Sequence, residues 1–72
     1  MKKIYKLCVV GAGRWGLNHV KALNRLDSLG GVVDKNKTVT DQIASDFPMC
    51  KTFSSLEDAF DYGFDGYIVS SP

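Results

Sequence analysis

Three glycines between an apolar run and a helical pattern constrain the fold of this chain more than any other feature. Residues 9–19 read VVGAGRWGLNH, which places the glycines at positions 11, 13 and 16. In a turn from strand to helix, Gly11 can adopt backbone angles closed to other residues, Gly13 lets a diphosphate approach the main chain, and Gly16 lets the helix pack close to the strand. Free N–H groups and the helix dipole attract an anion at such a turn. The spacing therefore predicts a phosphate-binding turn.

Strands and helices alternate along the rest of the chain. Aliphatic runs predict strands at 4–10, 29–33, 50–53 and 67–69. Helical spacing predicts one helix over 14–26 and a second one in which Val39, Ile43 and Phe47 recur at intervals of four before Pro48 ends it. A third helix runs to Phe60 and begins in a capping box, formed either by Ser54 with Glu57 or by the equally spaced pair at 55 and 58. The pattern predicts the α/β fold class: a partial Rossmann-type, doubly wound parallel sheet of about four strands with right-handed crossover helices.

Asp34 supplies the second part of a dinucleotide signature. It ends the second predicted strand, 18 residues after Gly16, where an acid accepts hydrogen bonds from the hydroxyls of an adenosine ribose. Its charge would repel a 2′-phosphate and favours NAD over NADP, although Lys35 beside it would partly neutralise such a phosphate. The alternative is an ordinary tight turn with a solvated aspartate. The register of strand, helix and acid favours the dinucleotide site.

Three other residues near the glycines have more than one possible role. Helical spacing places His19 on the inner face of the first predicted helix, which is more typical of a core histidine than of a catalytic one. Arg14 can reach a cofactor phosphate, and Trp15 can cover the loop or contact another domain. The aromatic residues near the end of the chain are expected to fill the core: Tyr62, Phe64 and Tyr67.

Charge and composition exclude several classes of function. The formal net charge of +1 is far from the basic excess of nucleic-acid-binding domains, so no nucleic-acid partner is expected. The apolar run at 7–10 is too short to span a membrane, which takes about 20 residues, and no signal-like segment precedes it. Cys8 and Cys50 form no metal-spaced motif. We expect a cytoplasmic protein with reduced, packed thiols and no metal site.

Four segments together resemble the start of the Gfo/Idh/MocA family, named after glucose-fructose oxidoreductase, inositol dehydrogenase and rhizopine catabolism. They are GAGRWGLNH at 11–19, VVD at 32–34, FSSLEDAF at 53–60 and FDGYIVSSP at 64–72. The resemblance implies an NAD(P)-dependent oxidoreductase acting on sugars, cyclitols or nucleotide-sugars, with a dinucleotide-binding domain followed by a substrate domain. The GxGxWGxNH loop and the LGGVVD strand are most similar to the branch that oxidises position 3 of UDP-linked amino sugars.

The resemblance also implies a cofactor site. Its residues are Gly11, Gly13, Arg14, Trp15 and Gly16 around the diphosphate, Asp34 at the ribose, and Ser70, Ser71 and Pro72 beside the nicotinamide half. His19 matches a family histidine, which implies a structural or cofactor-proximal role. The family's catalytic lysine, in a Glu-Lys-Pro motif, and its acid–base pair follow later than position 72, so no catalytic residue is predicted.

We therefore expect residues 1–72 to be the N-terminal portion of a dinucleotide-binding Rossmann domain, without the substrate domain and inactive by itself. The alternative is a complete small nucleotide-binding or assembly module without catalytic activity. A sheet of this size leaves an edge strand and part of one face exposed, which favours pairing with other chains. The sequence predicts a homo-oligomer formed through that edge or face.

Overall fold

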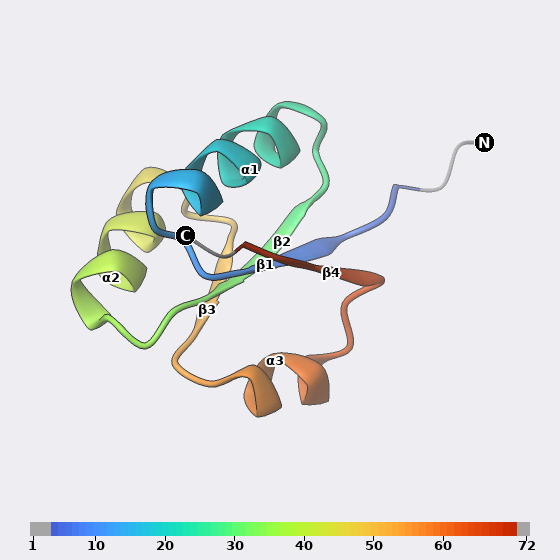
Figure 1. The fold of residues 1–72 in the computed structure, drawn as a ribbon. Coiled ribbons are helices and arrows are strands. Elements are labelled where there is room, and N and C mark those ends of the chain that lie inside the picture. Colours follow the sequence, from blue (N-terminus) through green and yellow to red (C-terminus); the bar gives the residue numbers. More distant parts are fainter. Residues whose placement is uncertain (1–3, 71–72) are drawn as a thin grey trace.

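The computed structural model describes residues 4–70 and has a single parallel sheet flanked by helices (Figure 1). The strands are β1 (Leu7–Val10), β2 (Leu29–Val33), β3 (Lys51–Phe53) and β4 (Gly66–Val69). The helices are α1 (Arg14–Arg25), α2 (Lys37–Asp46) and α3 (Leu56–Tyr62). The strand order is β3-β2-β1-β4, and every neighbouring pair is parallel. The predicted fold class is confirmed: this is a partial Rossmann-like α/β fold.

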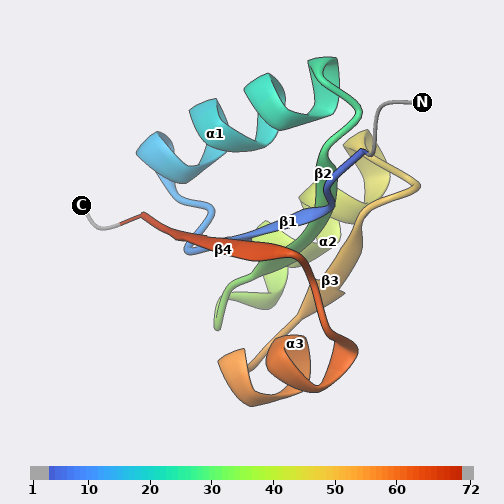
Figure 2. The same ribbon diagram turned by 90° about the vertical axis from the view of Figure 1, so that its right-hand side faces the viewer.

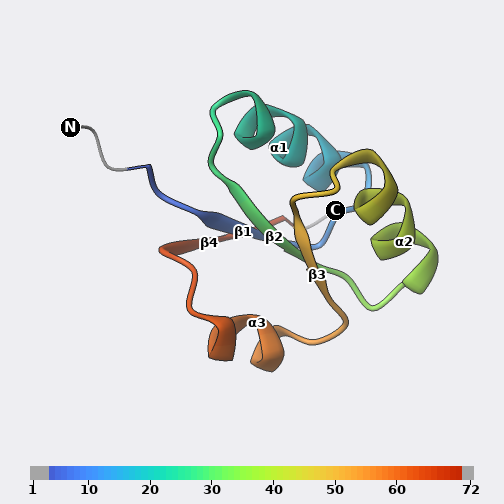
Figure 3. The same ribbon diagram turned by 180° about the vertical axis from the view of Figure 1, so that it is seen from behind.

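The helices cover the two faces of the sheet unequally. Helices α1 and α2 lie on one face and α3 lies on the other (Figure 2). Helix α1 packs on β1 and β2, α2 packs on β2 and β3, and α3 packs on β2 and β3 (Figure 3). The short helix α3 is thus the main cover of its face among the described residues. Among the described residues, no helix is long and apolar enough to cross a membrane.

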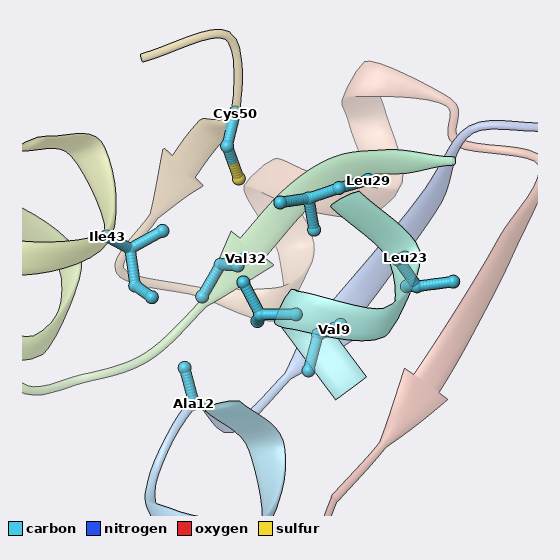
Figure 4. Packing of buried hydrophobic residues seen from close by; sticks show 8 residues of the cluster. Val9, Ala12, Leu23, Leu29, Val32, Ile43 and Cys50 are labelled. Carbon is cyan, nitrogen blue, oxygen red and sulfur yellow. The ribbon is translucent and has the colours of Figure 1, made fainter. Parts of the chain in front are cut away.

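The larger core lies between the sheet and the α1–α2 layer (Figure 4). Val9 and Val32 are adjacent in the β1–β2 register, and both are fully buried with Val20 of α1. Burying such a side chain contributes about 1.5–3 kcal/mol. Ile43 of α2 joins the same cluster. A smaller cluster on the α3 face contains Cys8, Val33 and Ala59 and is packed by Phe53, Phe64 and Tyr67. Strands β1 and β2 are apolar on both sides, with Val9 and Val32 in one cluster and Cys8 and Val33 in the other.

Helix α1 rests on the sheet through a narrower stripe than the sequence suggested. Gly16, Val20 and Leu23 are buried, whereas His19 is exposed and Leu26 is 70% exposed. The prediction that His19 lies on the inner face is therefore wrong. The buried residues of α1 are centred on Gly16 and Val20. Each residue turns the helix by about 100°, so His19, which precedes Val20, faces solvent.

Local side-chain caps set where α2 and α3 begin. Asn36 caps α2 by accepting a hydrogen bond from the Thr38 N–H at 2.9 Å. Ser55 caps α3 by accepting from the Asp58 N–H at 3.3 Å, so the second of the two predicted capping pairs is the one formed. Helix α3 ends at Gly63, which has the left-handed φ of 87°. That end lies beyond the predicted Phe60.

Candidate functional site

The carboxyl ends of the strands bring the glycine loop, Asp34 and Ser70 together. The Gly11 N–H donates to the Val33 oxygen at 2.8 Å, which ties the loop after β1 to the end of β2. The Ser70 N–H donates to the Val10 oxygen at 2.9 Å, which ties the end of β4 to the same loop. Because all four strands are parallel, these segments share one end of the sheet, where ligands bind in open α/β folds.

The chain's own packing explains two of the three glycines. Gly11 has a φ of +88°, and a Cβ on it would lie 2.8 Å from the Ser70 main-chain oxygen. A Cβ on Gly16 would lie 1.8 Å from the Gly11 oxygen, a distance that no shift of a side chain can relieve. These two glycines allow the loop to turn and α1 to approach it closely.

Gly13 is different, because nothing in the described chain requires a glycine there. Its φ of −71° is open to other residues, and a Cβ on it would meet no described atom within 4 Å. It is the N-cap of α1 and provides no side-chain cap. The main-chain N–H groups of the first helical turn have no partner within a helix. The exposed backbone at Gly13 therefore leaves room for an acceptor in front of these donors.

Asp34 holds the glycine loop as well as facing the site. Its Oδ2 accepts a hydrogen bond from the Ala12 N–H at 3.0 Å, and its Oδ1 accepts from the Asn36 N–H at 2.8 Å. Sequence reasoning assigned this carboxylate to a ribose and missed the contact with the loop. Each carboxylate oxygen has two lone pairs, so Asp34 keeps acceptor capacity for a further donor. The contact fixes Asp34 beside the glycines.

A cavity of about 510 Å³ opens next to Asp34 on the α3 side of the loop. Its volume falls within the range of small-molecule sites. The lining residues are Val10, Gly11, Val33, Asp34, Lys35, Ser54, Ser55, Leu56 and Glu57. The segment between β3 and α3 was not predicted as part of the site. The signal that could have found it is its position after a parallel strand, at the same sheet end as Asp34.

The remaining predicted residues are described only in part. The backbone of Arg14 and Trp15 forms the first residues of α1, but their side chains lie outside what the structure describes, as do Ser71 and Pro72. His19 lies on the exposed side of α1. Within residues 4–70, no group of three or more histidine, cysteine or acidic residues could hold a metal ion.

The two cysteines are buried in the cores rather than placed at the loop. Both are free thiols. Burial raises the pKa of the Cys8 thiol to about 11. Burial, with a smaller contribution from the charge of Cys8, raises the pKa of the Cys50 thiol to about 11. Both groups therefore stay protonated near neutral pH and act as small apolar side chains.

Comparisons with known proteins find the same fold within solved dehydrogenase structures. No protein-family model and no curated protein match the sequence. Among solved structures, apo scyllo-inositol dehydrogenase from Lactobacillus casei superposes with a TM-score of 0.85 and 20% identity, over 97% of this chain and 22% of that one. WlbA dehydrogenase from Bordetella pertussis, in complex with NADH and UDP-GlcNAcA, superposes with a TM-score of 0.84 and 26% identity, over 97% of this chain and 22% of that one. The WlbA dehydrogenase from Chromobacterium violaceum, with the same two ligands, superposes with a TM-score of 0.84 and 24% identity, over 99% of this chain and 21% of that one.

The likeness covers nearly all of this chain but little of the neighbours. The chain spans only about a fifth of each of these structures. At these identities the comparisons establish a partial Rossmann-like fold, which this chain shares with part of each of these dehydrogenases. Two of the neighbours carry NADH.

Proposed function

We propose that this chain binds a nicotinamide dinucleotide as the first portion of the dinucleotide-binding domain of a Gfo/Idh/MocA-type oxidoreductase. The observation that carries the proposal is Gly13. The packing of the chain accounts for Gly11 and Gly16, whereas a Cβ at Gly13 would enter open space at the start of α1. A glycine at that position keeps space for a ligand that approaches the main chain.

The diphosphate is proposed to bind the main chain of Gly13, Arg14, Trp15 and Gly16. The first N–H groups of α1 lack helical partners, and the positive end of the helix dipole lies there. These donors carry partial positive charge without a side-chain cap from Gly13. A diphosphate supplies the acceptors and the negative charge that the position favours.

Asp34 is proposed to hold the adenosine ribose, and the neighbouring cavity is proposed to hold the rest of the nucleoside. The carboxylate lines the cavity with Lys35 and is fixed by two main-chain donors. Its negative charge favours the diol of NAD over the 2′-phosphate of NADP, and Lys35 reduces that preference. Ser70, Ser71 and Pro72 are proposed to follow the cofactor toward its nicotinamide half.

We assign no catalytic residue to this chain. Hydride transfer needs a substrate held against the nicotinamide with an acid or base in reach, and His19, the only histidine of the chain, is exposed on α1. The proposed activity of the parent enzyme is oxidation of a sugar, cyclitol or nucleotide-sugar, and this portion is proposed to contribute cofactor binding alone. We also propose a cytoplasmic location, where the thiols of Cys8 and Cys50 stay reduced, and association with further copies of the chain.

Calorimetric titration of the 72-residue protein with NAD and with NADP tests the site. Gly13→Val should weaken dinucleotide binding at least about tenfold, because the branched side chain occupies the space in front of the N–H groups. Ala44→Val, on the exposed side of α2, is the matched control and should bind as the native protein does. Circular dichroism and urea unfolding verify that each variant is folded.

Two results would refute parts of the proposal. Equal affinity of Gly13→Val and the native protein would remove the diphosphate from this loop. A folded native protein that binds neither dinucleotide would overturn the proposed function of the chain as a whole.

A further inference from the structure

Two segments from different parts of the chain form the cavity next to Asp34. Val33 and Phe53 are register partners at the ends of β2 and β3, and the Asp34 N–H donates to the Phe53 oxygen at 3.0 Å. The segments that follow these two strands therefore lie side by side (Figure 1). The first segment contributes Asp34 and Lys35 to the cavity lining, and the second contributes residues 54–57.

The second segment adds a charged side chain to this cavity. Glu57 lines it from the first turn of α3. Within residues 4–70, neither the Glu57 carboxylate nor the Lys35 ammonium takes part in an ion pair, and both residues are exposed. Both charges are therefore available to a ligand. The lining has two carboxylates, those of Asp34 and Glu57, against one ammonium, so its net charge is negative.

We propose that Glu57 is a specificity-determining residue, which selects a dinucleotide without a 2′-phosphate. The inference rests on the proposed function, in which this cavity holds the adenosine half of the cofactor. An acid at the end of β2 favours the ribose diol, whereas a cation nearby accommodates a 2′-phosphate. Asp34 and Lys35 therefore have opposite preferences. Glu57 decides between them, because it offsets the charge of Lys35 and adds a second carboxylate that repels the phosphate.

The neighbouring Asp58 provides a matched comparison for Glu57. Both acids lie in the first turn of α3, where a negative charge interacts favourably with the helix dipole, and both are exposed. Only Glu57 lines the cavity. Asp58 takes part in the α3 cap through its main-chain N–H, which donates to the Ser55 hydroxyl, so a change of its side chain retains the cap. The two acids thus share a role in the helix and differ in their position relative to the cavity.

Calorimetric titration of the 72-residue protein with NAD and with NADP measures the ratio of the two dissociation constants. The native chain should bind NAD more tightly. Glu57→Gln should shift the ratio toward NADP at least about threefold, and Glu57→Lys at least about tenfold, because each removes repulsion of the 2′-phosphate. Lys35→Gln should shift the ratio in the opposite direction. Asp58→Asn removes the same charge as Glu57→Gln and should change the ratio by less than about 1.5-fold.

Salt dependence separates selection by charge from a change in the shape of the cavity. The screening length falls from about 10 Å at 0.1 M to about 3 Å at 1 M ionic strength. The effect of Glu57→Gln on the ratio should therefore shrink as salt is added. Urea unfolding verifies that each variant is folded. A loss of stability alone lowers the affinity for both dinucleotides equally and leaves the ratio unchanged.

Several outcomes would overturn the inference while NAD binding, and with it the proposed function, remained intact. They are a native preference for NADP, a Glu57→Lys variant that binds NADP no better than the native chain, and an Asp58→Asn variant whose ratio shifts as far as that of Glu57→Gln. A shift in Glu57→Gln that is unchanged at 1 M salt would reject charge as the cause. A folded native chain that binds neither dinucleotide would overturn the proposed function and this inference together.

Discussion

Replacing Asp34 tests whether its carboxylate organises the glycine loop in the absence of cofactor. Asp34→Ala removes the acceptors for the Ala12 N–H at 3.0 Å and for the Asn36 N–H at 2.8 Å. Hydrogen bonds to a charged group contribute about 1.5–3 kcal/mol each when protected from water. The bond to Ala12 is partly buried and the bond to Asn36 is exposed, so the first contributes more than the second.

These contributions give an expected loss of about 2 kcal/mol in the free energy of unfolding for Asp34→Ala. Asp34→Asn keeps one acceptor oxygen and should lose about 1 kcal/mol, because its amide hydrogens face a second main-chain donor. For a domain of this size, 1 kcal/mol corresponds to a decrease of about 4–8 °C in Tm. Asp61→Asn, which makes the same change on the exposed surface of α3, is the control and should alter the free energy by less than about 0.5 kcal/mol.

Urea unfolding and amide hydrogen exchange together provide the assay. The Ala12 amide should exchange faster in Asp34→Ala than in the native protein, because its acceptor has gone, while the amide of Val32 in the sheet core should change only as global stability does. If Asp34→Ala unfolds at the native urea midpoint and the Ala12 amide remains equally protected, the carboxylate does not hold the loop.

Three further predictions concern packing, capping and pH. Gly16→Ala should destabilise the protein by about 3 kcal/mol or more, because its Cβ would lie 1.8 Å from the Gly11 oxygen; a native-like Tm would contradict the close approach of α1 to the loop. Ser55→Ala should cost about 1 kcal/mol through loss of the α3 cap, whereas Ser54→Ala should cost less than half of that, and equal losses would reject the assignment of the cap. The free energy of unfolding should fall as pH rises from about 9 to 11, since the buried thiols have a pKa of about 11 against 9.0 in the unfolded chain. A Cys8→Ala variant should show a smaller fall. If this variant and the native protein have the same pH profile of stability, the thiols are not the cause.

The sequence predicted the order of elements because each one carries a local signal. The strand before Gly11 is aliphatic, and α2 follows its N-cap Asn36, whose side chain accepts from a main-chain N–H two residues later. The choice between two capping pairs at α3 was beyond local reasoning, since both have the same spacing. It depends on which serine has extended backbone angles, as Ser55 does with φ −136° and ψ 149°.

The error at His19 has a similar origin. A helical wheel assigns a broad apolar face, but the width of the buried stripe depends on how closely the helix approaches the sheet. At Gly16 the helix backbone almost touches the loop, with a hypothetical Cβ 1.8 Å from the Gly11 oxygen. The fully buried residues of α1 therefore lie along one line, through Gly16, Val20 and Leu23. Leu17 beside that line is half-buried against the core, whereas His19 and Leu26 face solvent.

The role of Asp34 shows why a site residue is harder to predict than a fold. Its position after β2 is a sequence feature, but its contact with Ala12 exists only because β1 and β2 are neighbours in register, with Val10 beside Val33. The same carboxylate contacts the loop and is the group that we propose to accept a hydrogen bond from a ribose. Loss of NAD binding in Asp34→Ala would combine both effects. Gly13→Val isolates the effect on the ligand, because the described chain contains no atom that the new Cβ would meet within 4 Å. The two variants together separate the organisation of the loop from its proposed use.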